Sequence, residues 1–247
     1  MSHSKSKYGI TIVIPVKNEE ENILQILGWI AREVKPDHKV IVVDGCSTDN
    51  TFELTRKYTK KNKGVKIIKT TPKNSAFKES LELGIKASKT SFVATMMGDL
   101  SDDPKTLNSM DRKTKDGADV VIASRYVKGG KVINKPKLQR IISWGVSKSL
   151  HLLTNIPVCD VSNPYTLYRR SLLVGIQPKS TTNELPIEML FRAHFAGAKI
   201  VEVPTTWRGR KAGNSKFKIL KIVPGFVKLY LWILAKSWHL SLKDSFS

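Results

Sequence analysis

Polar residues follow several apolar runs in the first half of the chain, and their types could bind a charged ligand. These polar segments are residues 15–19, 44–49, 98–104 and 124–130. Carboxylate oxygens are ligands that Mg²⁺ and Mn²⁺ prefer, but an acid just ahead of a helix is often only its cap. We expect Asp49 and Asp103 to be caps, because each directly precedes a predicted helix. The remaining acids are candidates for binding.

A long stretch in the middle of the chain contains only basic charges. Positions 120 to 159 hold seven bases and no acid, namely Arg125, Lys128, Lys131, Lys135, Lys137, Arg140 and Lys148. A guanidinium group can bind phosphate through a bidentate fork. An anionic ligand is therefore expected to meet this part of the chain.

Alternating strand and helix patterns place these segments at one edge of a sheet. Strands are predicted at 10–14, 40–43, 65–68, 92–96, 120–123 and 200–203, and helices at 19–34, 51–58, 75–87, from Pro104 and at 184–195. This rhythm is typical of an α/β fold with a mostly parallel sheet and helices on both faces. Ligands bind such folds at the carboxyl ends of the strands, so the polar loops should converge there.

The composition indicates one large domain with a C-terminal appendage, divided at 1–216 and 217–247. The chain has 247 residues, 40% of them hydrophobic, a net charge of +21 and a pI near 10. Such a charge favours nucleic acid, acidic lipid or a phosphorylated substrate as the partner.

The two cysteines are expected to be reduced thiols. The polar N-terminus predicts no signal peptide, and the longest apolar run, 229–235, is far shorter than the about 20 residues of a spanning helix.

Several segments match one family when taken together. They read IVIPVKNEEENI, IVVDGCSTDNT, GDLSDDP, DVVIASRYVKGG, Arg140 with Ser143, and WRGRKAGNSKF, and they extend from Ile10 to about Lys216. In these segments the chain resembles the family 2 glycosyltransferases of the GT-A fold, and among them the dolichol-phosphate mannose synthase-like branch. The resemblance implies inverting, metal-assisted transfer of a sugar from a nucleotide-sugar donor to a polyprenyl or dolichyl phosphate.

The resemblance also assigns roles on the donor side. Asp99 matches the second acid of the family's Asp-x-Asp and is expected to bind Mg²⁺ or Mn²⁺, with Ser101 and Asp102 as nearby ligands. The first acid of that motif is replaced by Met97. One carboxylate together with substrate phosphates is still an ordinary arrangement for Mg²⁺.

The nucleotide is expected between the first two polar loops. By resemblance, Asp44 faces the nucleobase and ribose, and Pro15, Asn18 and Glu19 line the opposite wall. Glu19 is equally well placed to stabilise the start of a helix. Gly45 and Cys46 stand where the family has Asp and Gly, and Gly45 is expected to supply the flexibility of the turn.

A phosphate acceptor requires different side chains in the site from those that a sugar hydroxyl acceptor requires. It is already anionic at neutral pH and requires cations instead of a general base. By resemblance, Arg125 and Arg140, with Ser143, hold the acceptor phosphate. Arg210 and Lys216 match a flexible basic segment that closes over donor and acceptor. The family's Ser-Gly-Phe-Arg is replaced by residues 163–166, Asn-Pro-Tyr-Thr, so one arginine is missing. Glu188 is expected either to bind sugar hydroxyls or serve as a base, or to form a structural ion pair.

The C-terminal segment indicates a lipid surface. Residues 217–238 form a broadly apolar helix with a narrow lysine stripe, which Pro224 and Gly225 should kink or divide. From Lys199 onward the chain has ten bases and two acids. We expect this helix to lie in the interface of an anionic, cytoplasmic membrane face. The alternative is a helix packed on its own domain, on a membrane subunit or on a second copy.

Two other functions remain open. A catalytically weakened GT-A scaffold or partner subunit is suggested by Met97, Gly45 and Thr166. A basic nucleic-acid-binding protein is suggested by the net charge of +21, although the chain lacks a recognised binding motif. The sugar and base also stay open, because guanine with mannose and uracil with glucose or an N-acetylhexosamine would use the same wall.

Overall fold

The core of the protein is a seven-stranded sheet that positions all the polar loops. The computed structural model describes residues 8–35, 37–74, 76–209 and 219–245. The strands are β1 (Ile10–Val16), β2 (Lys39–Asp44), β3 (Val65–Lys69), β4 (Phe92–Thr95), β5 (Val120–Ser124), β7 (Thr166–Arg169) and β8 (Ile200–Pro204). Their order is β3-β2-β1-β4-β7-β5-β8, and β7 is antiparallel to its neighbours β4 and β5. The other pairs are parallel, as the sequence predicts.

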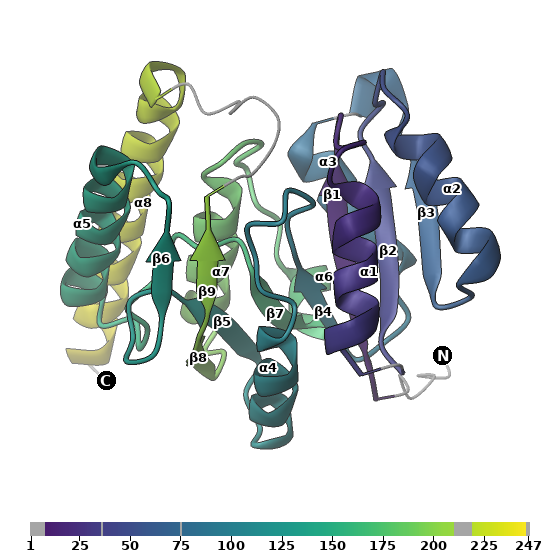
Figure 1. Cartoon of the computed structure of the whole chain (residues 1–247). Coiled ribbons are helices and arrows are strands. Elements are labelled where there is room, and N and C mark those ends of the chain that lie inside the picture. Colours follow the sequence, from purple (N-terminus) through teal and green to yellow (C-terminus); the bar gives the residue numbers. More distant parts are fainter. Residues whose placement is uncertain (1–7, 36, 75, 210–218, 246–247) are drawn as a thin grey trace.

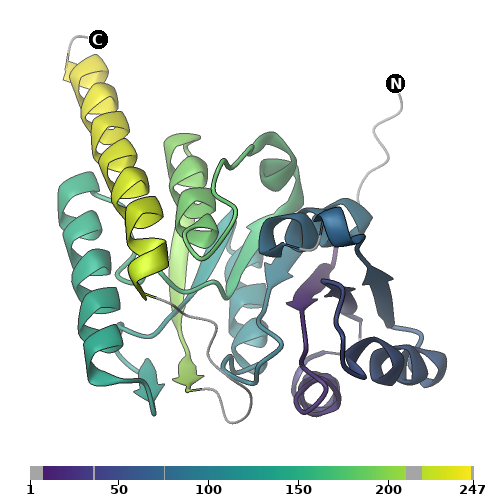
Figure 2. The ribbon, with the colours of Figure 1, turned by 90° about the horizontal axis from the view of Figure 1, so that it is seen from above.

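Helices cover both faces of the sheet, which confirms the expected α/β class (Figures 1 and 2). One face carries α1 (Ile23–Glu33), α2 (Thr51–Lys61) and α4 (Thr106–Lys115), and the other carries α3 (Phe77–Ala87), α5 (Lys137–Thr154), α6 (Arg170–Gly175), α7 (Leu185–Phe195) and α8 (Ile219–Ser245). Side chains alternate along each strand, so Ile12 and Ile14 of β1 join one core and Val13 joins the other. The apolar runs are thus buried on both sides, as parallel strands require.

The sheet reverses its winding direction between β1 and β4. After β1 the chain adds β2 and β3 on one side, and it then returns to place β4 on the other side of β1. Loops that leave two such neighbouring strands diverge, and ligands bind in the crevice between them. Gly98 follows β4 here, and a Cβ atom on it would lie 2.7 Å from Cγ1 of Val16 at the end of β1. The close approach of these loops therefore depends on glycine at position 98.

The middle of the chain contains elements that the sequence pattern does not predict. They are β6 (Lys131–Ile133), α5, β7, α6 and β9 (Thr206–Arg208), together with the short 3-10 turn Pro72–Asn74. β6 and β9 pair in parallel as a separate two-stranded sheet. Strands this short do not show an alternation of apolar and polar residues in the sequence. Much of the apolar surface of α5 faces outward. Burial periodicity is consequently weak in this region.

The C-terminal helix α8 is continuous and packs on the domain. It runs through Pro224, so of the two outcomes expected at this proline, a kink or a division, the helix is not divided. α8 packs against α5 and α7 and adds Leu229 and Ile233 to a core cluster. Trp232 lies beside Phe195 and under the Arg192 guanidinium, 5.0 Å from its ring centroid. The boundary expected at residue 216 therefore does not separate α8 from the core that precedes it.

Candidate active site

The loops after β1 and β2 are joined by hydrogen bonds at the carboxyl edge of the sheet. Asn18 adopts a left-handed conformation with φ of 53°. Its backbone N–H donates to Oγ of Ser47 (2.9 Å), and its side-chain oxygen accepts from the backbone N–H of Thr48 (2.9 Å). Asn18 is thus placed beside the second loop, as expected for one wall of a shared site.

The carboxylates of Asp44 and Glu19 are both occupied within these loops. Asp44 is fully buried and accepts from the backbone N–H (3.2 Å) and the hydroxyl of Ser47. Glu19 is also buried, and it accepts from the Asn22 amide at 2.8 Å. Both acids therefore organise the loop backbone in this structure. The left-handed residue of the turn is Cys46, with φ of 56°, so the expectation that Gly45 supplies the flexibility is wrong.

Of the two acids expected to be caps, Asp49 bonds the first residue of a helix, and Asp103 bonds the residue just ahead of one. Asp49 accepts from the backbone N–H of Thr51, the first residue of α2, at 3.0 Å. Asp103 accepts from the backbone N–H of Lys105 (3.1 Å), just before α4, and lies 3.8 Å from Arg208. Both carboxylates are therefore engaged by backbone N–H groups near the start of a helix, and neither is a candidate for binding a ligand.

The loop after β4 presents Asp99 and buries the acid beside it. Asp99 is half-buried and accepts from the backbone N–H of Ser101 (3.1 Å), and between them Leu100 has a φ of 63°. Non-glycine residues in the left-handed region are uncommon and often mark functional loops. Pro15 lines a small pocket at this edge together with Met96, Met97 and Pro164.

Asp102 and Ser101 do not lie where metal ligands were expected. Asp102 is 1% exposed, and its carboxylate accepts from the backbone N–H of Met97 at 3.0 Å. This hydrogen bond joins the two ends of the loop. Burial raises the pKa of Asp102 to about 7. Ser101 is 2% exposed. Within the described residues, no three His, Cys, Asp or Glu side chains are grouped as a metal site. Of the three expected metal ligands, Asp99 is therefore the one whose side chain is only partly buried.

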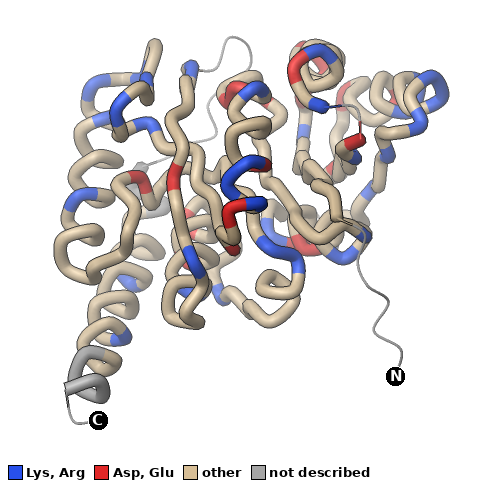
Figure 3. Tube along the Cα trace, turned by 90° about the horizontal axis from the view of Figure 1, so that it is seen from below, with Lys and Arg blue, Asp and Glu red and all other residues tan. Residues whose placement is uncertain are grey.

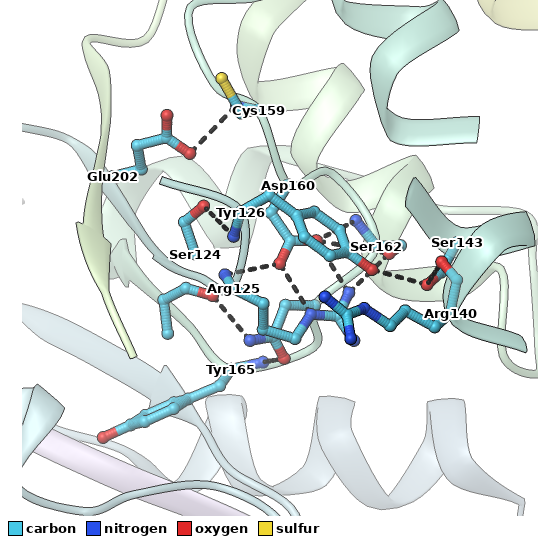
Figure 4. Close-up of polar contacts among 12 residues, drawn as sticks. Ser124, Arg125, Tyr126, Arg140, Ser143, Cys159, Asp160, Ser162, Tyr165 and Glu202 are labelled. Carbon is cyan, nitrogen blue, oxygen red and sulfur yellow. Dashed lines mark hydrogen bonds and ion pairs between the residues drawn. The ribbon is translucent and has the colours of Figure 1, made fainter. Parts of the chain in front are cut away.

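Arg125 is buried in an ion pair, which the sequence reasoning missed. Its Nε and Nη2 atoms donate to the two carboxylate oxygens of Asp160 at 2.7 and 2.8 Å, and Nη2 also donates to Ser162 (Figure 4). Burial lowers the pKa of Arg125, but the attraction of Asp160 outweighs this effect and leaves the pKa above its usual value. The fork expected to hold the acceptor phosphate is already bound to a carboxylate. Arg125 therefore fixes the loop after β5.

A polar cluster forms beside this ion pair at the start of α5. The Ser143 hydroxyl lies 2.7 Å from the Tyr126 hydroxyl, accepts from Nζ of Lys135 (2.9 Å) and contacts the Arg140 carbonyl (3.1 Å). Figure 4 shows the exposed Arg140 side chain extending from α5 toward the Arg125–Asp160 pair. We call these four residues, Tyr126, Lys135, Arg140 and Ser143, the α5 cluster.

Some candidates lie elsewhere. Glu188 is buried and accepts from the backbone N–H groups of Lys179 (2.9 Å) and Ser180 (2.7 Å) and from Arg192 (2.7 Å), which confirms its structural alternative. Asn163, in the segment that lacks the family's arginine, donates to the carbonyl of Ala123 (2.6 Å) at the end of β5. Arg210 and Lys216 lie outside the described residues.

Similarity to known proteins agrees with this geometry. The chain is 29% identical over 240 residues to the undecaprenyl-phosphate mannosyltransferase of Micrococcus luteus, which covers 93% of this chain and 96% of that protein. It is also 29% identical over 213 residues to the dolichol-phosphate mannosyltransferase of Pyrococcus furiosus, covering 85% of this chain and 59% of that protein.

A solved structure shows the same GT-A fold. It is the glucosyl-3-phosphoglycerate synthase of Mycobacterium tuberculosis in complex with Mn²⁺, UDP-glucose and phosphoglyceric acid, with a TM-score of 0.67 and 18% identity over 93% of this chain and 80% of that chain. The family model described as "Glycosyl transferase family 2" matches residues 11–175. The chain belongs to this family and is a glycosyltransferase.

Proposed function

We propose that this enzyme transfers a hexose, with mannose as the first candidate, from a nucleotide-sugar donor to a polyprenyl phosphate. The observation that carries the proposal is the α5 cluster, which gathers basic and hydroxyl groups at the end of β5, on the same edge of the sheet as Asp99. The relatives named undecaprenyl-phosphate and dolichol-phosphate mannosyltransferase support both the sugar and the acceptor class.

The reaction we propose is a single displacement with inversion. An oxygen of the acceptor phosphate attacks the anomeric carbon, and the bond between that carbon and the donor diphosphate breaks. The leaving nucleoside diphosphate takes the electron pair of that bond. Because the attacking phosphate oxygen carries no proton at neutral pH, the site needs cations that position it and no general base. Arg140 is exposed beside Ser143 and fills that role.

We assign the donor to the crevice between the loops after β1 and β4. Pro15, Asn18 and Asp44 stand on one side of it and Asp99 on the other. Asp99 would hold Mg²⁺ or Mn²⁺, which neutralises the charge that develops on a departing diphosphate. The neighbour solved with Mn²⁺ and UDP-glucose supports this assignment.

We further propose that α5 and α8 form the membrane-docking face. The two helices pack side by side (Figures 1 and 2). Their outer surfaces expose Leu138, Ile141, Ile142, Trp144, Leu152 and Leu153 on α5, and Val223, Val227, Leu231 and Trp238 on α8. An apolar face of this extent, with Lys137, Arg140, Lys148 and Lys228 around it, suits the interface of an anionic bilayer. Among the described helices, none is both long and apolar enough to cross a bilayer.

A transfer assay tests the proposed function. Purified full-length protein is incubated with GDP-mannose, UDP-glucose or UDP-N-acetylglucosamine, with Mg²⁺ or Mn²⁺, and with undecaprenyl or dolichyl phosphate in detergent. We expect one of these donors to give a polyprenyl-phosphate hexose as the product. Arg140→Ala should slow transfer much more than Lys137→Ala, a matched loss of charge on the same helix. A folded protein that transfers no sugar from any of these donors would instead support the weakened scaffold.

A further inference from the structure

Lys135 occupies an unusual position in the α5 cluster. It lies in the loop between β6 and α5, and its Nζ donates to the Ser143 hydroxyl at 2.9 Å. The same ammonium lies 5.3 Å from the ring centroid of Trp207 on β9. This contact explains how a lysine is held in a half-buried place.

The charge of Lys135 is not matched by a carboxylate. In the part of the chain that the structure describes, Asp160 is engaged by Arg125, and no ion pair joins Lys135 to an acid. Burial lowers the pKa of Lys135, and the charged groups that act on it are Arg125, which lowers that pKa further, and Asp160, which opposes the shift but is already paired with Arg125. Arg140 on α5 is linked to the same Ser143 through its backbone carbonyl. On β9, Arg208 follows Trp207 but pairs with Asp103 and lies over Trp29, away from the cluster. A half-buried cation that is not paired with a carboxylate is stabilised when an anion binds beside it.

We propose that Lys135 binds the phosphate group of the acceptor, next to the Ser143 hydroxyl and together with Arg140. This inference rests on the proposed function and adds a binding residue that the family resemblance does not supply. The hydroxyls of Tyr126 and Ser143 offer hydrogen bonds to the same phosphate oxygens. Because Arg125 is held by Asp160, Lys135 takes over the cationic contact that was expected from Arg125.

The geometry gives acceptor binding a defined dependence on pH. Burial, with the nearby Arg125 charge, lowers the pKa of Lys135 to about 8, while Asp160 opposes the shift. The phenol of Tyr126 shares the Ser143 hydroxyl with Lys135. A phosphate monoester gains its second charge near pH 6. Lys135 is charged below pH 8 and loses its proton above it, so acceptor affinity should be highest between the two values and fall at higher pH.

The test compares Lys135→Met and Lys135→Arg in the full-length protein. The Michaelis constants for polyprenyl phosphate and for the donor are measured from pH 6.5 to 9. Lys135→Met should raise the acceptor constant about tenfold, as expected when a hydrogen bond to a charged group is lost, and leave the donor constant within twofold. Lys135→Arg should keep the acceptor constant low and remove its rise above pH 8, since arginine stays charged.

Binding of citronellyl phosphate by calorimetry, with citronellol as the uncharged control, gives a readout that does not need transfer. Lys135→Met should weaken this binding about tenfold at pH 7. The inference is overturned if Lys135→Met changes acceptor binding less than twofold, or if Lys135→Arg retains the wild-type loss of affinity above pH 8. If the protein transfers no sugar but still binds the phosphate in a way that depends on Lys135, that result would count against the proposed reaction and not against the role of Lys135.

Discussion

The acids and bases at the carboxyl edge of the sheet divide into two groups, those that build the loops and those that face outward. Asp44, Asp102 and Arg125 are buried and bonded within the protein. Asp99, Arg140 and Lys135 are at least partly exposed. Side chains of the second group are the ones proposed to bind ligands, so substitutions in the two groups should have different consequences.

The buried Arg125–Asp160 pair should be important for stability. Removing one partner of a buried ion pair leaves an uncompensated charge and costs about 3–5 kcal/mol. We expect Asp160→Asn and Arg125→Met each to lower the free energy of unfolding in urea by about that amount. The double variant Arg125→Met with Asp160→Asn should be less destabilised than the sum of the two single changes. Additive effects would show that the two side chains do not act as a pair.

Asp99 should matter for activity and little for folding. Asp99→Asn removes the charge of a half-buried side chain, so the urea midpoint should stay close to that of the wild type. Transfer should fall about 100-fold or more if this carboxylate holds the metal beside the diphosphate. Asp103→Asn is the matched control, because Asp103 lies in the same loop but bonds the backbone N–H of Lys105 just ahead of α4. Transfer within threefold of wild type at saturating Mn²⁺ would contradict the assignment of Asp99.

At the scale of an element, α8 has two faces with different roles. Leu229 and Ile233 are buried in the core, and the neighbouring Leu231 is 61% exposed. Positions two apart on a helix point in nearly opposite directions, so one helix can serve both core and surface. The expectation of a packed helix therefore applies to one face of α8, and the interfacial helix is a proposal for the opposite, exposed face.

Substitutions on the two faces of α8 should separate these roles. Ile233→Ala should lower the free energy of unfolding by about 2–5 kcal/mol, because it leaves a cavity among α5, α7 and α8. Leu231→Ala should leave that free energy nearly unchanged and should weaken binding to anionic vesicles. Urea unfolding and vesicle co-sedimentation of both variants check this. Equal losses of stability would mean that Leu231 is also covered in the folded protein.

At the scale of the whole molecule, positive charge and apolar surface coincide. The net charge is +21, and α5 carries Lys137, Arg140 and Lys148 without an acid. Figure 3 shows lysine and arginine along the helices on the C-terminal side of the molecule. Arg140 belongs both to this surface and to the α5 cluster. A docked protein would thus present the residues proposed to bind phosphate to the lipid phosphates of the bilayer.

Membrane binding should depend on both components of this face. The full-length protein should bind vesicles containing anionic lipid, bind neutral vesicles less, and lose affinity as salt screens the charges. Ile141→Ser with Leu231→Ser should reduce binding at every salt concentration, since it removes apolar contact and no charge. Leu24→Ser, a change of an exposed side chain on α1 in the other half of the molecule, serves as control. Unchanged binding of the double variant would place the membrane contact elsewhere.

The sequence was sufficient for the parts of the fold that repeat a pattern. Buried strands such as β1 are apolar on both faces, and the helix of residues 23–33 shows its buried positions at Ile23, Ile26, Leu27 and Ile30. Local periodicity of this kind reflects burial directly. The class of fold and the loops of the site followed from it, and the family followed from the motifs within those loops.

Which charges are free could be decided only by the tertiary structure. Asp160 lies 35 residues from Arg125 in the sequence, and the two meet because β5 and the segment before β7 are brought together. Nothing in the spacing marks Lys135 as different from the other bases between positions 120 and 159. Its burial, its contact with Trp207 and its unmatched charge arise from elements distant in sequence. Residue type thus determined the chemistry that was available, and packing determined which groups remained able to perform it.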